Sequence, residues 1–227
     1  MPKIITSKEA AALVKEGSSV MFGGFVGCGT AKKVVKEICN LGTKNLTIFC
    51  NDGGRIYPDG TFYGVAELFH NHQIKKFYAT HIGINPEVGQ QMNEGTLEVV
   101  LCPQGSFVEM IRAGGAGLGG VLTPTGVGTI TEKYEYVYQK INLDGKDYLL
   151  LKPFTADFTI IEGYKVDKNG NVWYKGTARN FCPMMATAGR TVIVEAENLV
   201  EPGEIEPENV VTPGSFVDYI VYDGGNK

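Results

Sequence analysis

The chain has 227 residues and a net charge of −4 at pH 7, with 43% hydrophobic and 20% charged residues; this suits one substantial α/β domain of a soluble globular protein. It has no basic stretch that could neutralise a run of phosphates, which argues against a nucleic-acid partner. The N-terminus is too polar for a signal peptide and no apolar run approaches about 18 residues, so we expect a cytoplasmic protein that does not enter a membrane.

Helices and strands are predicted to alternate through the first half of the chain. A helix is expected in residues 6–17, where Thr6 and Glu9 form a capping box and Gly17 ends the helix. Another begins near Thr30, because its apolar residues recur with the helical period. The other expected elements are strands in 18–25, 45–50, 74–81 and 97–102 and helices in 63–71, 85–95 and 104–115. This order predicts parallel βαβ units with helices on both faces of an open sheet.

The pattern changes after residue 113. Residues 113–129 hold seven glycines in 17 positions, which excludes a helix or the interior of a regular strand. Asp144-Gly145 predicts the turn of an antiparallel hairpin, and a further hairpin is expected in 156–176. A helix and a buried strand should then fill 182–196, and a strand should end the segment 211–222. Since no composition break divides the chain, we predict a single domain over residues 1–227, mostly parallel with an inserted antiparallel portion.

Cysteine and histidine give no metal-binding pattern. No C-x-x-C occurs, and His70 and His72 lack a third ligand at suitable spacing. Buried, reduced thiols explain the cysteines best. They are Cys28, Cys39, Cys50, Cys102 and Cys182.

The stretch "VMFGGFVGCGTAKKVV", residues 20–35, places four glycines between a strand and a helix. The dinucleotide fingerprint fails because Lys32 stands where its third glycine belongs, and the phosphate-binding P-loop fails for want of Gly-Lys-Ser/Thr. What remains is a loop with unshielded amides at a helix N-terminus, which favours anions and developing oxyanions. A simple tight turn is the alternative interpretation.

Other glycine-containing loops follow, or lie near, the ends of expected parallel strands, at residues 51–54, 103–106 and 113–120. Ligands of open α/β sheets bind at the carboxyl ends of the strands. Asn51 and Gln104 can orient a carbonyl group there, and nearby amides can stabilise its charge. We therefore predict a site for an anionic or acyl ligand, although Gln104 as a helix cap and Asn51 as a turn former remain open.

Several long motifs resemble one known family over residues 4–222. They resemble the α subunit of the family I, 3-oxoacid-type coenzyme A transferases, and within that family the acetate– and butyrate–acetoacetate enzymes. The motifs are "GGFVGCGTAKKVV", "ND" at 51–52, "HIGINPEVGQQM", "CPQGSFVEMIRAGGAGLGGVLTPTGVGT", "ARNFCPMMATAGRTVIVEAENLVEPGEI" and "VTPGSFVDYIV". The resemblance implies a fold shared with ribose-phosphate isomerases.

The resemblance also implies a ping-pong transfer of CoA between short carboxylates through a glutamyl-CoA thioester, with CoA as substrate and no permanently bound cofactor or metal. The family's nucleophilic glutamate lies in a Glu-Asn-Gly motif of the β half. Glu197 and Glu208 are each followed by asparagine but not by glycine. We therefore expect no catalytic nucleophile in this chain, a separate β subunit that supplies it, and an α2β2 heterotetramer.

Individual residues match the family's motifs. Gln104 matches a glutamine expected near the thioester carbonyl, and Asn51 matches a polar residue expected near the acyl substrate. Ala31 stands where the family usually has proline, which implies a less rigid loop. The residues that match the CoA-binding motif are Gly23, Gly24, Phe25, Val26, Gly27, Cys28 and Gly29.

Two other functions stay open at this point. A sugar-phosphate isomerase on a related scaffold would need an acid/base pair within the chain, and Asp52 with Glu109 are the only plausible pieces. A non-catalytic acyl-CoA-binding module would need no partner to bind CoA tightly.

Overall fold

A large, mostly parallel sheet forms the centre of the protein in a computed structural model that describes residues 1–224. Its strands follow the order β1-β14-β13-β11-β2-β3-β6-β7, each parallel to its neighbours, and β12 pairs antiparallel with β11. The strands are β1 (Lys3–Ile5), β2 (Ser19–Phe22), β3 (Leu46–Phe49), β6 (Ile74–Ala79), β7 (Glu98–Leu101), β11 (Ala156–Asp167), β12 (Val172–Trp173), β13 (Gly189–Val200) and β14 (Tyr219–Val221).

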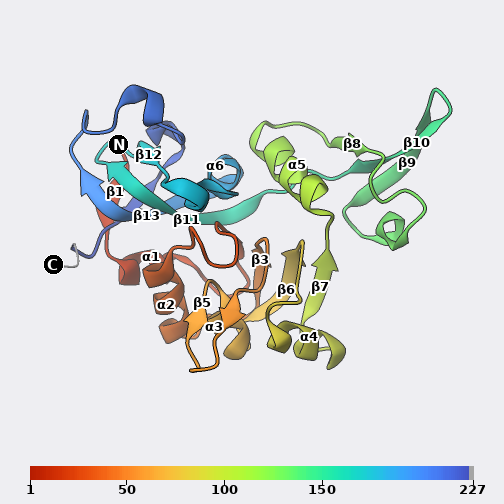
Figure 1. Cartoon of the computed structure of the whole chain (residues 1–227), viewed down its shortest axis with the longest axis horizontal. Helices are drawn as coiled ribbons and strands as arrows, with labels where there is room; N and C mark the ends of the chain where they lie inside the picture. Colours follow the sequence, from red (N-terminus) through yellow and green to blue (C-terminus); the bar gives the residue numbers. More distant parts are fainter. Residues whose placement is uncertain (225–227) are drawn as a thin grey trace.

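Helices cover both faces of this sheet, as predicted. Helices α1 (Ser7–Leu13), α2 (Lys32–Leu41), α3 (Ala66–His70) and α4 (Pro86–Asn93) lie on one side, and α5 (Gln104–Gly115) and α6 (Cys182–Met185) lie on the other (Figure 1). The side chains of β2 alternate accordingly: Val20 and Phe22 join the core with α1 to α4, whereas Met21 joins the core with α5 and α6. Because side chains alternate between the two faces of a strand, β2 contributes residues to two separate apolar cores.

Local signals placed α1 and α2 correctly. Thr6 Oγ1 accepts the Glu9 N–H at 3.2 Å while Glu9 Oε2 accepts the Thr6 N–H at 2.8 Å, so the predicted capping box is confirmed. The predicted end of α1 is wrong, because Val14 already has an extended backbone and Gly17 lies in the following turn. The buried residues of α2 have the predicted spacing; they are Val34, Val35, Ile38 and Cys39.

An antiparallel arm projects from the sheet (Figure 1). It consists of β8 (Val121–Thr123), β9 (Val137–Leu143) and β10 (Lys146–Leu151), in the order β8-β10-β9. Asp144 and Gly145 both have positive φ, at 51° and 80°, and the predicted hairpin is confirmed. The helix predicted in 104–115 is confirmed as α5, whereas the prediction that 113–129 hold no strand is wrong at Val121–Thr123, where β8 pairs with β10.

The hairpin predicted in residues 156–176 is real, but its place in the fold differs from the prediction. Strand β11 pairs with β12 and also lies in the middle of the large sheet, parallel to both β2 and β13. Ile160 and Ile161, which point to opposite faces, are both fully buried. Burial on both faces marks a central strand of an α/β sheet.

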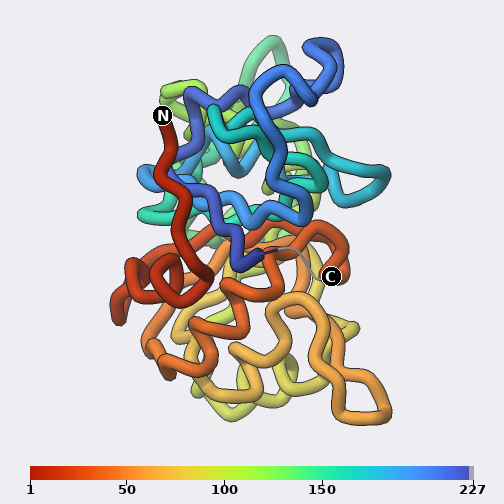
Figure 2. The backbone as a smooth tube through the Cα atoms, turned by 90° about the vertical axis from the view of Figure 1, so that its left-hand side faces the viewer, coloured from red at the N-terminus to blue at the C-terminus, as the bar shows by residue number. Residues whose placement is uncertain are grey.

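The smaller elements and the chain ends complete the fold. A short hairpin of β4 (Arg55–Ile56) and β5 (Phe62–Tyr63) was not predicted, and β1 lies beside β14 (Figure 2). The 3-10 helices are η1 (Ile130–Lys133), η2 (Gly176–Arg179), η3 (Pro207–Asn209) and η4 (Gly214–Phe216). In residues 1–224 no helix is long and apolar enough to span a bilayer. The single domain over 1–227 stays a prediction.

Candidate active site

Two predicted site residues meet at the carboxyl edge of the sheet. Asn51 follows β3, and Gln104 is the first residue of α5, after β7. Gln104 Nε2 donates a hydrogen bond to Asn51 Oδ1 at 2.7 Å. Residues 53 positions apart in sequence thus meet, because parallel strands present their carboxyl ends at one edge.

The surroundings of Asn51 and Gln104 test the alternative roles of turn former for Asn51 and helix cap for Gln104. Asn51 is only 2% exposed, its Oδ1 also accepts the Thr80 hydroxyl at 2.8 Å, and its Nδ2 donates to Asp52 Oδ2 at 2.8 Å. Such a buried amide, hydrogen-bonded through both its oxygen and its nitrogen, does more than form a turn. Pro103 occupies the N-cap position of α5, so the Gln104 carboxamide contacts Asn51 and does not cap the helix.

An open pocket of about 320 Å³ lies beside Gln104. Its apolar wall brings together the glycine-rich loop, α5 and the segment before α6, and the polar residues Gln104 and Asn180 also line it. The lining residues are Phe25, Gln104, Gly105, Val108, Asn180 and Phe181. An apolar hollow with a few polar groups at one side suits a small acyl group next to a polar carbonyl.

The glycine-rich loop is folded onto itself. The Phe25 and Cys28 backbones exchange two hydrogen bonds of 3.0 Å, and the Gly23 N–H donates to Ile160 O at 3.0 Å. The Val26 N–H donates to Asp52 Oδ2 at 2.7 Å. The expectation of unshielded amides is therefore wrong for these four residues, because two pair within the closed turn and the other two donate to Ile160 and Asp52.

The loop is also enclosed by η2. A Cβ on Gly29 would lie 2.5 Å from Ala178 O, and Gly29 has a φ of +87°. Asn180 Nδ2 donates to Cys28 O at 2.8 Å, and Cys28 Sγ lies 3.3 Å from Thr177 Oγ1. Glycine at position 29 thus allows two loops that are distant in sequence to approach closely.

The N-terminus of α2 holds an anion that belongs to the chain itself. Glu195 on β13 is buried, and its Oε2 accepts the N–H groups of Lys33 and Val34, both at 3.0 Å. The sequence analysis inferred that the loop and this helix start favour anions and developing oxyanions. At the amides of Lys33 and Val34, Glu195 already supplies the negative charge that the helix dipole favours. Ala31 is the N-cap, with a φ of −67° that proline also adopts.

Glu162 lies next to Glu195, since the two residues are register partners on β11 and β13. They face a pocket of about 540 Å³ that also contains Lys32 and Lys33. Desolvation by burial raises the pKa of Glu162 from 4.5 to about 7, and the neighbouring Glu195 adds to this effect. Burial raises the pKa of Glu195 as well.

This raised pKa predicts a pH-dependent stability. Between pH 4.5 and about 7 the folded chain binds more protons at Glu162 than the unfolded chain does, so its free energy of unfolding should fall as the pH rises. Glu162→Gln removes the buried charge and should stabilise the chain at pH 8 by about 1–2 kcal/mol, a figure lowered for partial solvent exposure, and much less at pH 5. Urea titrations at both pH values measure the difference.

Glu208→Gln is the control for this prediction, because Glu208 is an exposed carboxylate. Its effect should be the same at both pH values. A Glu162→Gln variant with equal effects at pH 5 and pH 8 would contradict the assignment of the raised pKa.

The acid/base pair required by an isomerase does not form. Asp52 accepts three hydrogen bonds from the chain, including one from the Gly54 N–H at 2.9 Å. Glu109 instead pairs with Arg112 on the same helix, at 2.7 Å.

The histidines do not form a metal-binding group with their neighbours. His70 Nδ1 lies 2.9 Å from Glu87 Oε1, and no group of three potential metal ligands occurs within the described range 1–224.

Three residues of this site are not predicted individually from the sequence. They are Thr80, Asn180 and Phe181. Their signal was present, because the polar Asn180 precedes a short helix and Thr80 directly follows a parallel strand. Both positions are typical of ligand-binding edges.

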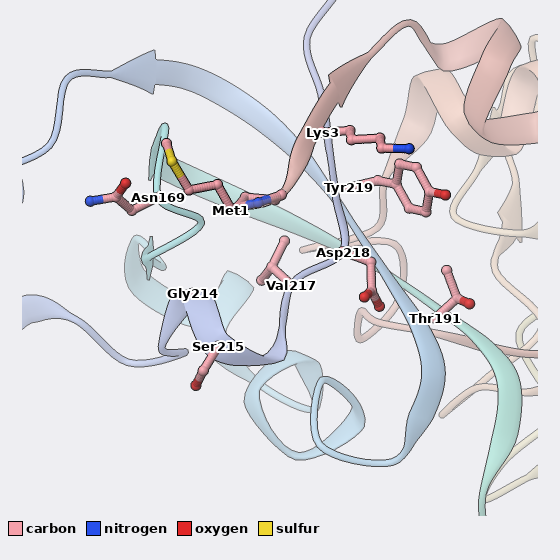
Figure 3. A pocket seen from close by; sticks show the side chains of 10 residues that line it. Met1, Lys3, Asn169, Thr191, Gly214, Ser215, Val217, Asp218 and Tyr219 are labelled. Carbon is pink, nitrogen blue, oxygen red and sulfur yellow. The ribbon is translucent and has the colours of Figure 1, made fainter.

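A larger cavity of about 590 Å³ contains none of the predicted site residues. The start of the chain and the segment around Gly214 to Tyr219 enclose it (Figure 3). Lys3 and Tyr219 are the first residues of β1 and β14, so the cavity lies at the amino ends of these strands. Asp218 Oδ2 accepts the Val192 N–H at 2.8 Å and therefore has a structural contact.

Comparisons with known proteins give a consistent result. Residues 4–223 match the family described as Coenzyme A transferase. The chain is 49% identical over 219 residues to the acetoacetyl-CoA:acetate/butyrate CoA transferase alpha subunit of Clostridium acetobutylicum, covering 96% of this chain and 97% of the relative. It is 41% identical over 225 residues to the acetate CoA-transferase subunit alpha of Escherichia coli K12, covering 99% of both.

Solved structures show the same fold. An acyl-CoA transferase of Escherichia coli O157:H7, in a thioester complex with CoA, aligns with a TM-score of 0.85 and 20% identity over 98% of this chain. This chain spans about half of that longer protein, 47% of its length. Glutaconate coenzyme A-transferase of Acidaminococcus fermentans aligns with a TM-score of 0.81 and 21% identity, covering 96% of this chain and 75% of that one. The predicted fold class is confirmed.

Proposed function

Since this chain belongs to the coenzyme A transferase family, we propose that it is the α subunit of an enzyme that moves CoA between acetoacetate and acetate or butyrate. Two alpha subunits of such enzymes match nearly its full length. The observation that carries the proposal is the pair Gln104–Asn51 beside an apolar pocket, because it provides a fixed N–H donor next to space for a short acyl chain.

The chemistry requires a carboxylate nucleophile. A glutamate attacks the thioester carbonyl of the acyl-CoA, the CoA thiolate leaves, and an acyl–glutamyl anhydride forms. The thiolate then attacks the glutamyl carbonyl, which releases the acyl group as a carboxylate and leaves a glutamyl-CoA thioester. The second carboxylate reverses these steps and receives CoA. Activation of the acyl group is conserved throughout, so no ATP is needed.

Gln104 stabilises the charge that develops in each addition step. Its Nε2 carries two hydrogens, and one of them is donated to Asn51 Oδ1. The other hydrogen is available to the thioester oxygen, which becomes an oxyanion when the nucleophile adds. Phe25, Val108 and Phe181 would then surround the acyl chain.

The nucleophile itself is assigned to a separate β subunit. Two acidic residues lie close in sequence to Asn51 and Gln104. They are Asp52 and Glu109, and both are held by contacts within the chain. Glu197 lines the different pocket near Lys32, and Glu208 lies on an exposed 3-10 helix. The β subunit must therefore place its glutamate in the open pocket beside Gln104. An α2β2 assembly, with two copies of each chain, would allow this contact.

The test is co-production with a second chain of similar size that carries the Glu-Asn-Gly motif. The pair should exchange CoA between acetoacetyl-CoA and a panel of short carboxylates, and borohydride reduction of the enzyme–CoA thioester should label the partner alone. A CoA adduct on a glutamate of this chain would overturn the proposal. Tight CoA binding by this chain alone, with no transfer by the pair, would instead identify a binding module.

A further inference from the structure

One buried carboxylate, Asp52, touches both halves of the candidate site, and the transfer chemistry leaves it without a role. We propose that Asp52 is a positioning residue: it holds the glycine-rich loop directly and holds the Gln104 carboxamide through Asn51. This inference rests on the function proposed above, since it concerns the same site.

Asp52 is 2% exposed and directly follows Asn51 after β3. Its Oδ2 accepts the Val26 N–H at 2.7 Å and Asn51 Nδ2 at 2.8 Å, and its Oδ1 accepts the Gly54 N–H at 2.9 Å. Three neutral N–H donors thus converge on one buried carboxylate. Such hydrogen bonds are stronger than those between neutral groups, and they fix the direction of every donor.

The first of these contacts holds a strained residue. Val26 has a φ of 49°, which is unfavourable for a β-branched side chain. Strained backbone persists where surrounding contacts determine it, and it gathers at functional sites. The Val26 N–H bond to Asp52 is such a contact. Phe25, the preceding residue, is 45% exposed and lines the pocket beside Gln104, so Asp52 indirectly sets one wall of the pocket.

The second contact decides which way two amides face. An ionised carboxylate only accepts hydrogen bonds, so Asn51 must turn its NH₂ group toward Asp52. This leaves Asn51 Oδ1 for Gln104, which must then present its own NH₂ group. The donor that faces the thioester therefore follows, through Asn51, from the charge on Asp52.

Asp52→Asn in the assembled enzyme tests this role. Asparagine has one acceptor oxygen in place of two, so its NH₂ group must face at least one of the three N–H donors. We expect kcat to fall roughly 10- to 100-fold, because a small displacement of a catalytic donor is costly. The KM for acetoacetyl-CoA should change by less than about threefold, since the lost interaction acts in the transition state.

Asp167→Asn is a matched control. Asp167 is also buried, and it accepts the N–H groups of Asn169 and Asn171, both at 2.9 Å, and Asn171 Nδ2 at 2.8 Å. It is the last residue of β11, directly before the turn to β12. Both variants should lose stability, but only Asp52→Asn should lose kcat. Equal kcat values in the two variants would refute the positioning role.

A double-mutant cycle with Gln104→Ala separates positioning from general damage. If Asp52 acts through Gln104, the double variant should have nearly the kcat of Gln104→Ala alone, whereas independent effects would multiply. Asn51→Ala leaves Asp52 and its loop contact in place but removes the group through which Asp52 acts on Gln104, so its cycle with Gln104→Ala tests that link if Asp52→Asn does not assemble. Multiplying effects in the cycle that assembles would overturn the proposal. Absence of CoA transfer by the wild-type pair would instead refute the proposed function.

Discussion

Gln104→Ala should lower the kcat of the assembled transferase by about 10²- to 10³-fold, the usual effect of removing one oxyanion donor. The loss is expected in kcat because the thioester oxygen gains its charge only when the nucleophile adds. The folded state should tolerate the change, since Gln104 is exposed and its side chain contacts Asn51 at the surface of the pocket. Steady-state kinetics with acetoacetyl-CoA and acetate, together with a thermal unfolding curve, measure both effects.

Gln104→Glu sharpens the test. A glutamate at position 104 has nearly the same shape, but when ionised it offers no N–H to Asn51 Oδ1 or to the substrate. It should be as impaired as the alanine variant at pH 8. Gln90→Ala, on the exposed side of α4, should retain full activity. Full activity of Gln104→Glu would exclude the donor role.

Gly29→Ala should destabilise the protein and disable the site together. The new Cβ would lie 2.5 Å from Ala178 O, and Gly29 has the positive φ that disfavours alanine. The backbone conformation costs about 1 kcal/mol and the overlap adds about 1–3 kcal/mol, so the free energy of unfolding should fall by about 2–4 kcal/mol. Because relief of the overlap moves the loop away from η2, kcat should fall as well.

Gly42→Ala separates the two contributions. Gly42 ends α2 with a φ of +66°, but a Cβ there would meet no atom within 4 Å. It should therefore lose only the conformational part, about 1 kcal/mol, and keep its activity. Urea titration and initial rates compare the two variants. Equal losses of stability would show that the contact with Ala178 has no energetic consequence.

The position of Glu195 changes how the glycine-rich loop is understood. A strand–loop–helix unit often binds a phosphate at the helix N-terminus, but here the amides of Lys33 and Val34 already bind Glu195. An incoming anion would have to displace a buried carboxylate from the chain. Under the proposed function the loop serves the acyl end of the site through Phe25, and binding of CoA by Gly23 to Gly29 stays a prediction.

Local patterns determined much of this fold. The capping box of Thr6 and Glu9, the apolar spacing of α2 and the turn at Asp144-Gly145 were all predictable, because each depends on residues within a few positions of one another. The order of strands and helices gave the parallel sheet and its carboxyl edge. That edge was enough to select Asn51 and Gln104 as candidates for the site.

Only the tertiary structure decided which distant groups meet. Gln104 joins Asn51 across 53 positions, and Glu195 reaches the first turn of α2 across 161 to 162 positions. Strand β11 carries a local hairpin signal, but its central place depends on pairing with β2 and β13. Such contacts depend on sheet order and on competition for buried polar groups, which no short window of sequence contains. For that reason the sequence identified the edge of the sheet, whereas the fold determined how its donors are oriented and which of them are already occupied.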